Sequence, residues 1–145
     1  MKTVLFLCTG NYYRSRFAEI FFNWNAQRRG MPWHAESRGL ALDPFNMGPM
    51  SRHAQLHLRQ LGISLDGYQR MPQPVAEHDF ERAHHVVAVK QTEHRPLIER
   101  NFPTRLARVE FWEVDDLDCA GPEVAIPHLE REVVALMDRL TASTS

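Results

Sequence analysis

A cysteine, an arginine and a serine lie close together near the amino end of the chain, at positions 8, 14 and 15. A thiol is a weak nucleophile while it is protonated, but a helix N-terminus and a nearby guanidinium favour the thiolate of Cys8. The planar guanidinium of Arg14 can bind two oxygens of a tetrahedral anion, and more tightly as charge spreads over a transferring phosphoryl group. Ser15 can hydrogen-bond the thiolate or assist the departing thiol. Together these residues predict nucleophilic attack on a phosphate or a similar oxyanion.

The residues around this group predict a loop that binds an anion through its backbone. Residues 4–7 are apolar, as in a strand buried on both faces, and residues 14–28 place apolar side chains at helical spacing. Gly10 and Asn11 tolerate left-handed backbone conformations, which let successive N–H groups face inward. A strand, a tight loop and a helix N-terminus in this order form an anion site. The expected substrate-binding residues are Thr9, Gly10, Asn11, Tyr12, Tyr13 and Arg14.

The remaining chain alternates strand-like and helical segments. We expect strands at 4–8, 33–37, 85–89 and 108–111, and helices at 14–28, 52–61, 75–82, 92–101 and from residue 121 onward. Pro96 is expected in the first turn of its helix, where a missing N–H costs nothing. This order predicts an α/β fold of three layers, α/β/α, with a four-stranded parallel sheet in the flavodoxin-like order 2-1-3-4. Cys8 then lies at the carboxyl end of the first strand, where such sheets bind ligands.

An acidic segment after the fourth expected strand offers a general acid. Asp115, Asp116 and Asp118 should emerge at the same edge of the sheet as Cys8. Expelling an alkoxide or a phenoxide from a phosphoester is slow unless an acid protonates the leaving oxygen. A carboxyl group near apolar or anionic neighbours keeps its proton to higher pH. The residues alone therefore indicate that one of the three aspartates is the acid.

Composition and charge argue against several classes of protein. The 145 residues are 43% hydrophobic and 10% aromatic, enough for one packed domain spanning residues 1–145. With 17 basic and 18 acidic residues the formal net charge is -1, so no basic field favours nucleic acid or an anionic membrane. The first apolar run stops at Cys8, short of the roughly 7 to 15 residues that a signal peptide requires, so we expect a cytoplasmic protein. Cys8 and Cys119 supply neither a disulfide framework nor a C-x-x-C pair.

The loop residues Cys8, Gly10, Asn11, Arg14 and Ser15 resemble a known signature. In their strand-to-helix context they are similar to the C-x-G-N-x-x-R-S phosphate-binding loop of the low-molecular-weight protein tyrosine phosphatases. The resemblance implies a hydrolase without cofactor or metal, which acts on phosphotyrosine-like esters through a cysteinyl-phosphate. Its expected partners are a phosphorylated protein or a small aryl phosphate, with inorganic phosphate as the product. The chain is expected to be a monomer or a weak dimer.

The resemblance also selects an acid from the acidic segment. Aligning from Phe111 makes Asp116 the counterpart of the family's acid, with Leu117 where a proline usually stands. The aromatic residues that follow in the family are Asp118 and Cys119 here, so a phenol ring needs other walls. The candidate walls are Tyr12, Phe45 and Trp112.

Other positions depart from the family's pattern. Gly67 replaces a histidine that helps to brace the phosphate loop, and Tyr13 occupies the position of a second loop cysteine. Lys90 and Glu93 stand where the resemblance places an acidic residue and an amide. We therefore expect the edge of the site after the third strand to differ from that of the family.

Two other functions remain open from the sequence. Thioredoxin-coupled arsenate reductases share the scaffold and the loop, but they need resolving thiols to relay a disulfide away from the first cysteine, and only Cys119 could serve. A non-catalytic phosphate-binding module is favoured by the altered acid segment and disfavoured because the loop keeps its Cys, Arg and Ser. His53 and His57 lie one helical turn apart, but without the Glu of an H-E-x-x-H motif they predict no metal site.

Overall fold

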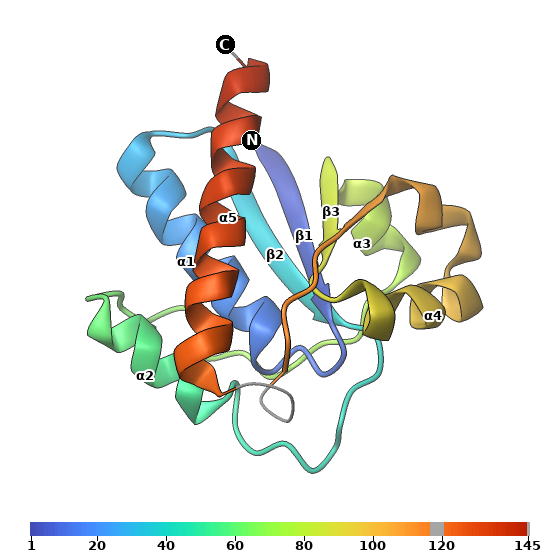
Figure 1. Ribbon diagram of the computed structural model, residues 1–145, viewed down its shortest axis with the longest axis horizontal. Helices are drawn as coiled ribbons and strands as arrows, with labels where there is room; N and C mark the ends of the chain where they lie inside the picture. The colour runs from blue at the N-terminus through green and yellow to red at the C-terminus, as the bar shows by residue number, and fades with distance from the viewer. Residues whose placement is uncertain (117–120, 145) are drawn as a thin grey trace.

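The computed structural model describes residues 1–116 and 121–144 (Figure 1). Its centre is a four-stranded sheet in the order β2-β1-β3-β4, in which every neighbouring pair is parallel, and this confirms the predicted fold class. The strands are β1 (Lys2–Cys8), β2 (Trp33–Gly39), β3 (His85–Ala88) and β4 (Val109–Phe111). The helices are α1 (Arg14–Arg29), α2 (Arg52–Gln60), α3 (Glu77–Arg82), α4 (Gln91–Asn101) and α5 (Pro122–Thr144), with a 3₁₀ helix, η1, at Pro103–Arg108.

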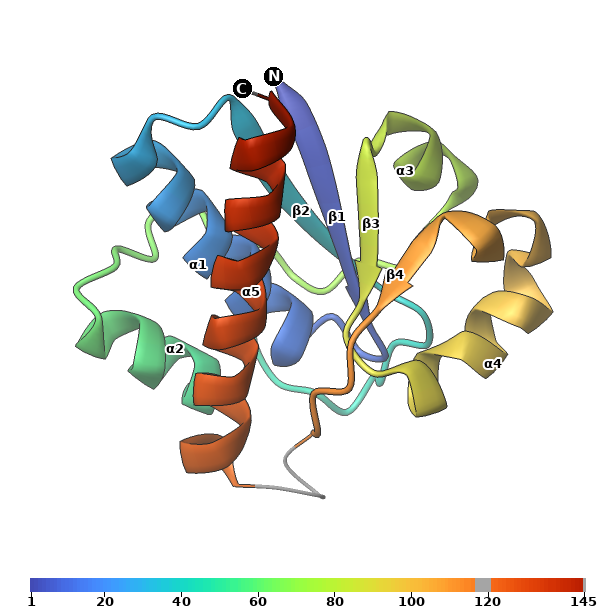
Figure 2. The same cartoon turned by 45° about the horizontal axis from the view of Figure 1, so that its top comes forward.

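Helices cover both faces of the sheet, with α1, α2 and α5 on one face and α3 and α4 on the other (Figures 1 and 2). Successive side chains of a strand point to opposite faces. In β1, Val4 and Phe6 therefore join the core beneath α1 and α5, whereas Leu5 and Leu7 join the core beneath α3 and α4. All four side chains are fully buried, which explains why this strand is an unbroken apolar run in the sequence.

The carboxyl ends of the strands meet at one edge of the sheet, and there β2 comes very close to the loop after β1. Cys8 pairs with Gly39 where both strands end. A Cβ atom on Gly39 would lie 2.8 Å from the carbonyl oxygen of Thr9 and 2.5 Å from the side chain of Leu42. Only glycine therefore lets the end of β2 approach the loop after β1 at this distance.

The helix α5 is fastened to the edge of the sheet through one carboxylate. Arg139 donates two hydrogen bonds to Glu110 of β4, at 2.9 and 2.8 Å. His85 Nε2 lies 3.0 Å from the same carboxylate, and Trp112 Nε1 donates to it at 2.6 Å. Burial opposes ionisation of Glu110, but the hydrogen bonds from His85, Arg139 and Trp112 outweigh it and hold the pKa of Glu110 far below its usual range.

Pro96 does not lie in the turn of α4 in which the sequence predicts it. The helix begins at Gln91, so Pro96 is its sixth residue and lies in the second turn, and the prediction of a first-turn position is wrong. The missing N–H leaves the carbonyl of Thr92 without its helical donor. Both residues are exposed, so water can bond that carbonyl. The 3₁₀ helix η1, which was not expected, follows directly and leads into β4.

None of the described helices combines the length and the apolar character that a bilayer crossing requires.

Candidate active site

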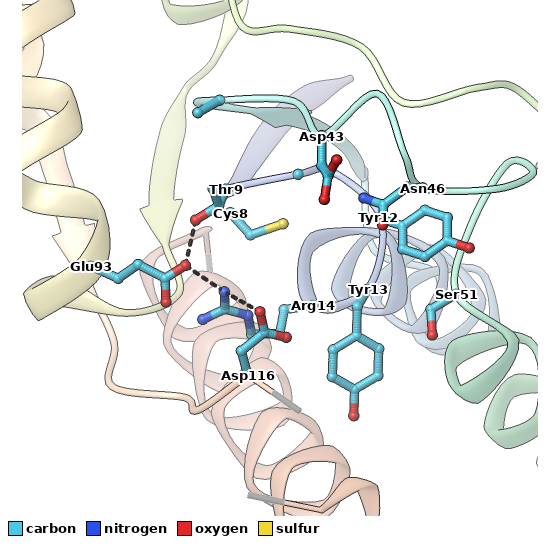
Figure 3. Close-up of a pocket in the computed structure, with 12 residues that line it drawn as sticks. Cys8, Thr9, Tyr12, Tyr13, Arg14, Asp43, Asn46, Ser51, Glu93 and Asp116 are labelled. Carbon is cyan, nitrogen blue, oxygen red and sulfur yellow. Dashed lines mark hydrogen bonds and ion pairs between the residues drawn. The ribbon is translucent and has the colours of Figure 1, made fainter. Parts of the chain in front are cut away.

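The segments that follow the strands border a cavity of about 410 Å³ (Figure 3). Its floor is the loop between β1 and α1, which contributes Cys8, Thr9, Gly10, Tyr12, Tyr13 and Arg14. Asp43 and Asn46 line it from the segment after β2, and Glu93 and Asp116 from the segments after β3 and β4. Asn11 belongs to the same loop, but its side chain is fully buried beneath it. The structure thus brings five of the six expected substrate-binding residues to one cavity, and Asn11 supports them from below.

The thiol of Cys8 lies at the floor of the cavity, at the end of β1. Its side chain is 3% exposed, and its Sγ atom is 2.9 Å from Ser15 Oγ. Asn11 Nδ2 donates a hydrogen bond to the same hydroxyl oxygen at 2.8 Å. Because Ser15 Oγ accepts that bond, its own hydrogen is available to the sulfur when Cys8 is a thiolate. The geometry fits the role expected of Ser15.

The guanidinium of Arg14 lies beside the thiol and is held by several oxygens. The side chain is only 2% exposed. Nη1 donates to the carbonyl of Val114 at 3.1 Å, and Nη2 donates to Glu93 Oε1 at 2.9 Å and lies 3.4 Å from Asp116 Oδ2. Burial alone would lower the pKa of Arg14, but the charges of Cys8, Glu93 and Asp116 outweigh it and raise this pKa above its ordinary value. The arginine therefore stays charged.

Glu93 lines the cavity, although the sequence did not predict a role for it in the site. It accepts hydrogen bonds from Thr9 Oγ1 and from Arg14 Nη2 (Figure 3). His94 Nε2 is 3.5 Å from the same oxygen. The contact with His94, together with the bonds from Arg14 and Thr9, holds the pKa of Glu93 far below its usual range despite partial burial. The sequence indicated only that the segment after the third strand departs from the family's pattern, and it did not indicate a role for Glu93.

The loop between β1 and α1 is held from below through Asn11, whose φ of 51° is left-handed. Its amide nitrogen donates to Ser37 Oγ at 2.9 Å, and its amide oxygen accepts from Arg70 Nη1 at 3.0 Å and from Gln73 N at 3.1 Å. Burial is the main cause that lowers the pKa of Arg70 to about 10. Gly67 lies instead at a separate hollow beside Trp24 and Tyr68. Arg70 therefore braces this loop through Asn11.

The expected walls for a substrate ring are only partly in place. Tyr12 lines the cavity, and its hydroxyl donates to the carbonyl of Met47 at 2.5 Å. Trp112 is wrongly predicted as a wall, because its ring is buried in the core against Phe6, with centroids 5.8 Å apart. Phe45 is 88% exposed and is not among the residues that line the cavity.

Tyr13 forms another part of the cavity wall. Its ring is buried, and its hydroxyl has no hydrogen-bond partner within the described parts of the chain. Burial, followed by the charge of Asp116, raises the pKa of Tyr13 to about 12, so the phenol stays protonated.

The candidate acids occupy different places. Asp116 lines the cavity and lies next to Arg14. Asp115 is half-exposed and accepts a hydrogen bond from Lys90 Nζ at 2.8 Å, and this bond lowers the pKa of Asp115. Asp118 and Cys119 lie outside the described residues. Of the aspartates that the structure describes in this segment, Asp116 is therefore the one that lines the cavity.

The sequence is similar to those of known phosphatases. The family model of the low molecular weight phosphotyrosine protein phosphatases matches residues 3–122. The chain is 31% identical over 90 residues to the low molecular weight protein-tyrosine-phosphatase YfkJ of Bacillus subtilis, across 61% of this chain and 56% of the relative. It is also 31% identical over 99 residues to a protein-arginine-phosphatase of the same organism, across 68% of this chain and 62% of that relative. These alignments span less than two thirds of each relative.

Solved structures extend the likeness to the whole chain. The crystal structure of YfkJ superposes with a TM-score of 0.86 at 22% identity, over 100% of this chain and 98% of that chain. The low molecular weight protein tyrosine phosphatase from T. tengcongensis gives a TM-score of 0.77 at 26% identity, over 99% of each chain. The match of the family model to most of the sequence, together with this fold, shows that the chain belongs to the low molecular weight phosphotyrosine protein phosphatase family.

Proposed function

We propose that this protein hydrolyses phosphotyrosine-like phosphate esters through a cysteinyl-phosphate formed on Cys8. The observation that carries the proposal is the placement of Cys8, Arg14 and Asp116 around one cavity (Figure 3). The thiol lies at the floor beside a buried guanidinium, and a carboxyl group stands at the rim. This arrangement supplies a nucleophile, an oxyanion clamp and an acid to one phosphoryl group.

In the first step the Cys8 thiolate attacks phosphorus, and a sulfur–phosphorus bond forms. The bond from phosphorus to the leaving oxygen breaks, and its electron pair stays on that oxygen. Asp116 in its acid form gives this oxygen a proton, so an alcohol or a phenol departs. The guanidinium of Arg14 and the backbone N–H groups of the loop hold the three equatorial oxygens.

In the second step water attacks phosphorus from the side that the leaving group vacated. The carboxylate of Asp116 takes a proton from this water, and the sulfur–phosphorus bond breaks with its electron pair returning to sulfur. Ser15, whose hydroxyl lies 2.9 Å from Sγ, can donate a hydrogen bond to the departing thiolate. Inorganic phosphate then leaves the loop.

The direct test is incubation with an aryl phosphate and measurement of released phosphate, together with mass spectrometry of rapidly quenched protein. We expect turnover and a gain of one phosphoryl group on the peptide that carries Cys8. Turnover without this adduct would contradict the covalent route. Arsenate-dependent oxidation of a thiol donor, with no phosphate release, would favour the reductase alternative instead.

A second candidate substrate is phosphoarginine, because one relative is named a protein-arginine-phosphatase and because of the charge at the rim. Asp43 and Asp116 both line the cavity and lie on different sides of the thiol (Figure 3). Carboxylates suit the guanidinium of phosphoarginine better than the ring of phosphotyrosine. If phosphoarginine is the substrate, Asp43→Asn should lower kcat/KM for a phosphoarginine peptide and leave that for a phosphotyrosine peptide unchanged. Asp66→Asn, outside the cavity lining, is the control.

A further inference from the structure

A carboxylate stands beside the anion site of this protein, where a negative charge opposes the binding of phosphate. We propose that Glu93 is a positioning residue, which orients the guanidinium of Arg14 for the phosphoryl group and at the same time weakens the retention of the product phosphate. This inference rests on the proposed function, because it concerns how the same loop binds and releases phosphate. It requires that Glu93 be fixed, ionised and in contact with Arg14.

A buried histidine and a half-buried threonine hold the carboxylate from behind. His94 is fully buried, and its Nδ1 atom accepts a hydrogen bond from the backbone N–H of Lys90 at 3.0 Å. The ring hydrogen therefore lies on Nε2, which is 3.1 Å from Thr9 Oγ1 and 3.5 Å from Glu93 Oε1. Thr9 in turn donates to Glu93. The loop after β1 and the first turn of α4 thus hold one oxygen of Glu93 in place.

The contact with Glu93 also constrains Arg14. The guanidinium is bonded through Nη1 to the carbonyl of Val114 and through Nη2 to Glu93. These acceptors come from separate segments of the chain, so together they fix the plane of the group. A guanidinium carries five N–H donors, so these two bonds and the 3.4 Å ion pair with Asp116 still leave two donors for phosphoryl oxygens. Holding the group in advance removes part of the ordering cost of the transition state.

The charge of Glu93 acts in the opposite direction on a bound anion. The same carboxylate that orients Arg14 repels a phosphate dianion in the loop, in the substrate and in the product alike. Orientation depends on the acceptor oxygen, whereas repulsion depends on the charge. Substitutions that remove one property and keep the other therefore separate the two effects.

Glu93→Gln keeps an acceptor oxygen and removes the charge. We expect this variant to bind inorganic phosphate roughly fivefold more tightly than wild type, the scale of one unit-charge interaction at short range in a wet site. Its kcat should fall only slightly, or should become limited by phosphate release. Glu93→Asp keeps the charge but is too short to reach Arg14, so we expect kcat to fall about tenfold without tighter phosphate binding. Glu93→Ala should also lose kcat.

The experiment measures phosphate affinity by titration calorimetry, kcat and KM with an aryl phosphate, and thermal unfolding of each variant. Glu99→Gln is the matched control, because Glu99 lies on the same helix in an exposed ion pair with Arg95. If Glu93→Gln binds phosphate no more tightly than wild type, the charge effect is refuted. If Glu93→Asp and Glu93→Ala keep the wild-type kcat, the orienting role is refuted. Gln is nearly isosteric with Glu, so Glu93→Gln should stay folded. The charge effect can therefore be tested even if Glu93→Ala unfolds.

The outcome can be separated from that of the proposed function. Phosphate titration needs no turnover, so it tests the charge of Glu93 even if wild type hydrolyses no ester. An inactive wild type that binds phosphate, with tighter binding by Glu93→Gln, would reject the proposed hydrolysis and keep the charge effect. If the wild type hydrolyses the ester and Glu93→Gln binds phosphate no more tightly, the proposed hydrolysis is kept and the charge effect is rejected.

Discussion

The 2.9 Å contact between Cys8 Sγ and Ser15 Oγ bears on both proposed steps, because the sulfur enters and leaves its bond to phosphorus as an anion. Replacing Cys8 by Ser keeps the size of the side chain and the loop around it. An alcohol is a far weaker nucleophile than a thiolate, because it stays protonated near neutral pH. We therefore expect Cys8→Ser to abolish steady-state turnover while inorganic phosphate still binds. Measurement of released phosphate checks the loss of turnover, and a phosphate titration checks the retained binding. Appreciable turnover by Cys8→Ser would count against a covalent mechanism.

Asp116 can be tested through its dependence on the leaving group. General-acid assistance is typically worth about 10²–10⁴-fold, and it matters most when the leaving oxygen is basic. We expect Asp116→Asn to slow an alkyl or unactivated aryl phosphate on that scale and an activated aryl ester much less. Asp115→Asn is the control, because Asp115 bonds to Lys90. If Asp118→Asn showed the leaving-group dependence and Asp116→Asn did not, the acid would lie two residues further on.

The residues of the site differ in how far the sequence could reveal them. Cys8, Arg14 and Ser15 are contiguous with their loop, so their spacing in the chain predicts their spacing in space. Glu93 and Arg70 reach the loop from 79 and 59 residues away, Glu93 through Arg14 and Arg70 through Asn11. Their roles depend on tertiary packing, which no local pattern encodes. Trp112 was misplaced for a similar reason, since an apolar ring suits a core as well as a substrate wall.

The elements were easier to predict than their ends. Apolar runs and helical spacing located β1, α1 and α5 closely, and Ser51 caps α2 by accepting from His53 N, as its residue type predicts. Strand β4 is three residues long and only half-buried, which gives a weak signal, and its start was placed one residue too early. A proline marks the neighbourhood of a helix start, but it does not fix the first residue of α4.

The segment between α2 and α3 contacts the loop after β1 through Arg70. This side chain bonds Asn11, Ser37 and Glu19, so it links the left-handed turn of the loop to the core. We expect Arg70→Met to lower kcat roughly tenfold, because Asn11 loses a bond that holds its strained conformation. It should also lower the Tm, because Glu19 loses a charge partner.

Arg70→Lys separates these two effects. A lysine restores a positive charge near Glu19 but cannot reproduce the planar set of donors. Steady-state kinetics and thermal unfolding should therefore show more recovery in Tm than in kcat. The exposed Arg59→Met serves as the control. Equal recovery of both quantities would indicate that Arg70 acts through stability alone.

For the molecule as a whole, the attachment of α5 to β4 predicts a pH-dependent stability. The pKa of Glu110 is lower in the folded protein than in the unfolded chain, so its contribution is present above about pH 4.3 and is lost as the pH falls below that value. We expect Glu110→Gln to lower the Tm by roughly 2–4 °C at pH 7. This difference from wild type should shrink as the pH drops below about 4.

Thermal unfolding monitored by circular dichroism from pH 7 to pH 3 checks this prediction. Glu99→Gln removes an exposed i,i+4 pair with Arg95 and should change the Tm very little at any pH. A Tm difference for Glu110→Gln that stays constant across this range would show that packing, and not ionisation, accounts for the effect.

The strand β1 begins at the end of the sheet opposite to the cavity and ends at Cys8 beside the cavity. The helix α5 ends near the start of β1 (Figure 2). Seven residues of extended chain separate the two ends of β1, a span of roughly 20 Å. A fluorophore or a biotin handle attached beside Lys2 therefore lies on the side of the molecule away from the Cys8 thiol. A sensor surface that captures the protein there will present the cavity to the flowing solution, and every captured molecule will face the same way.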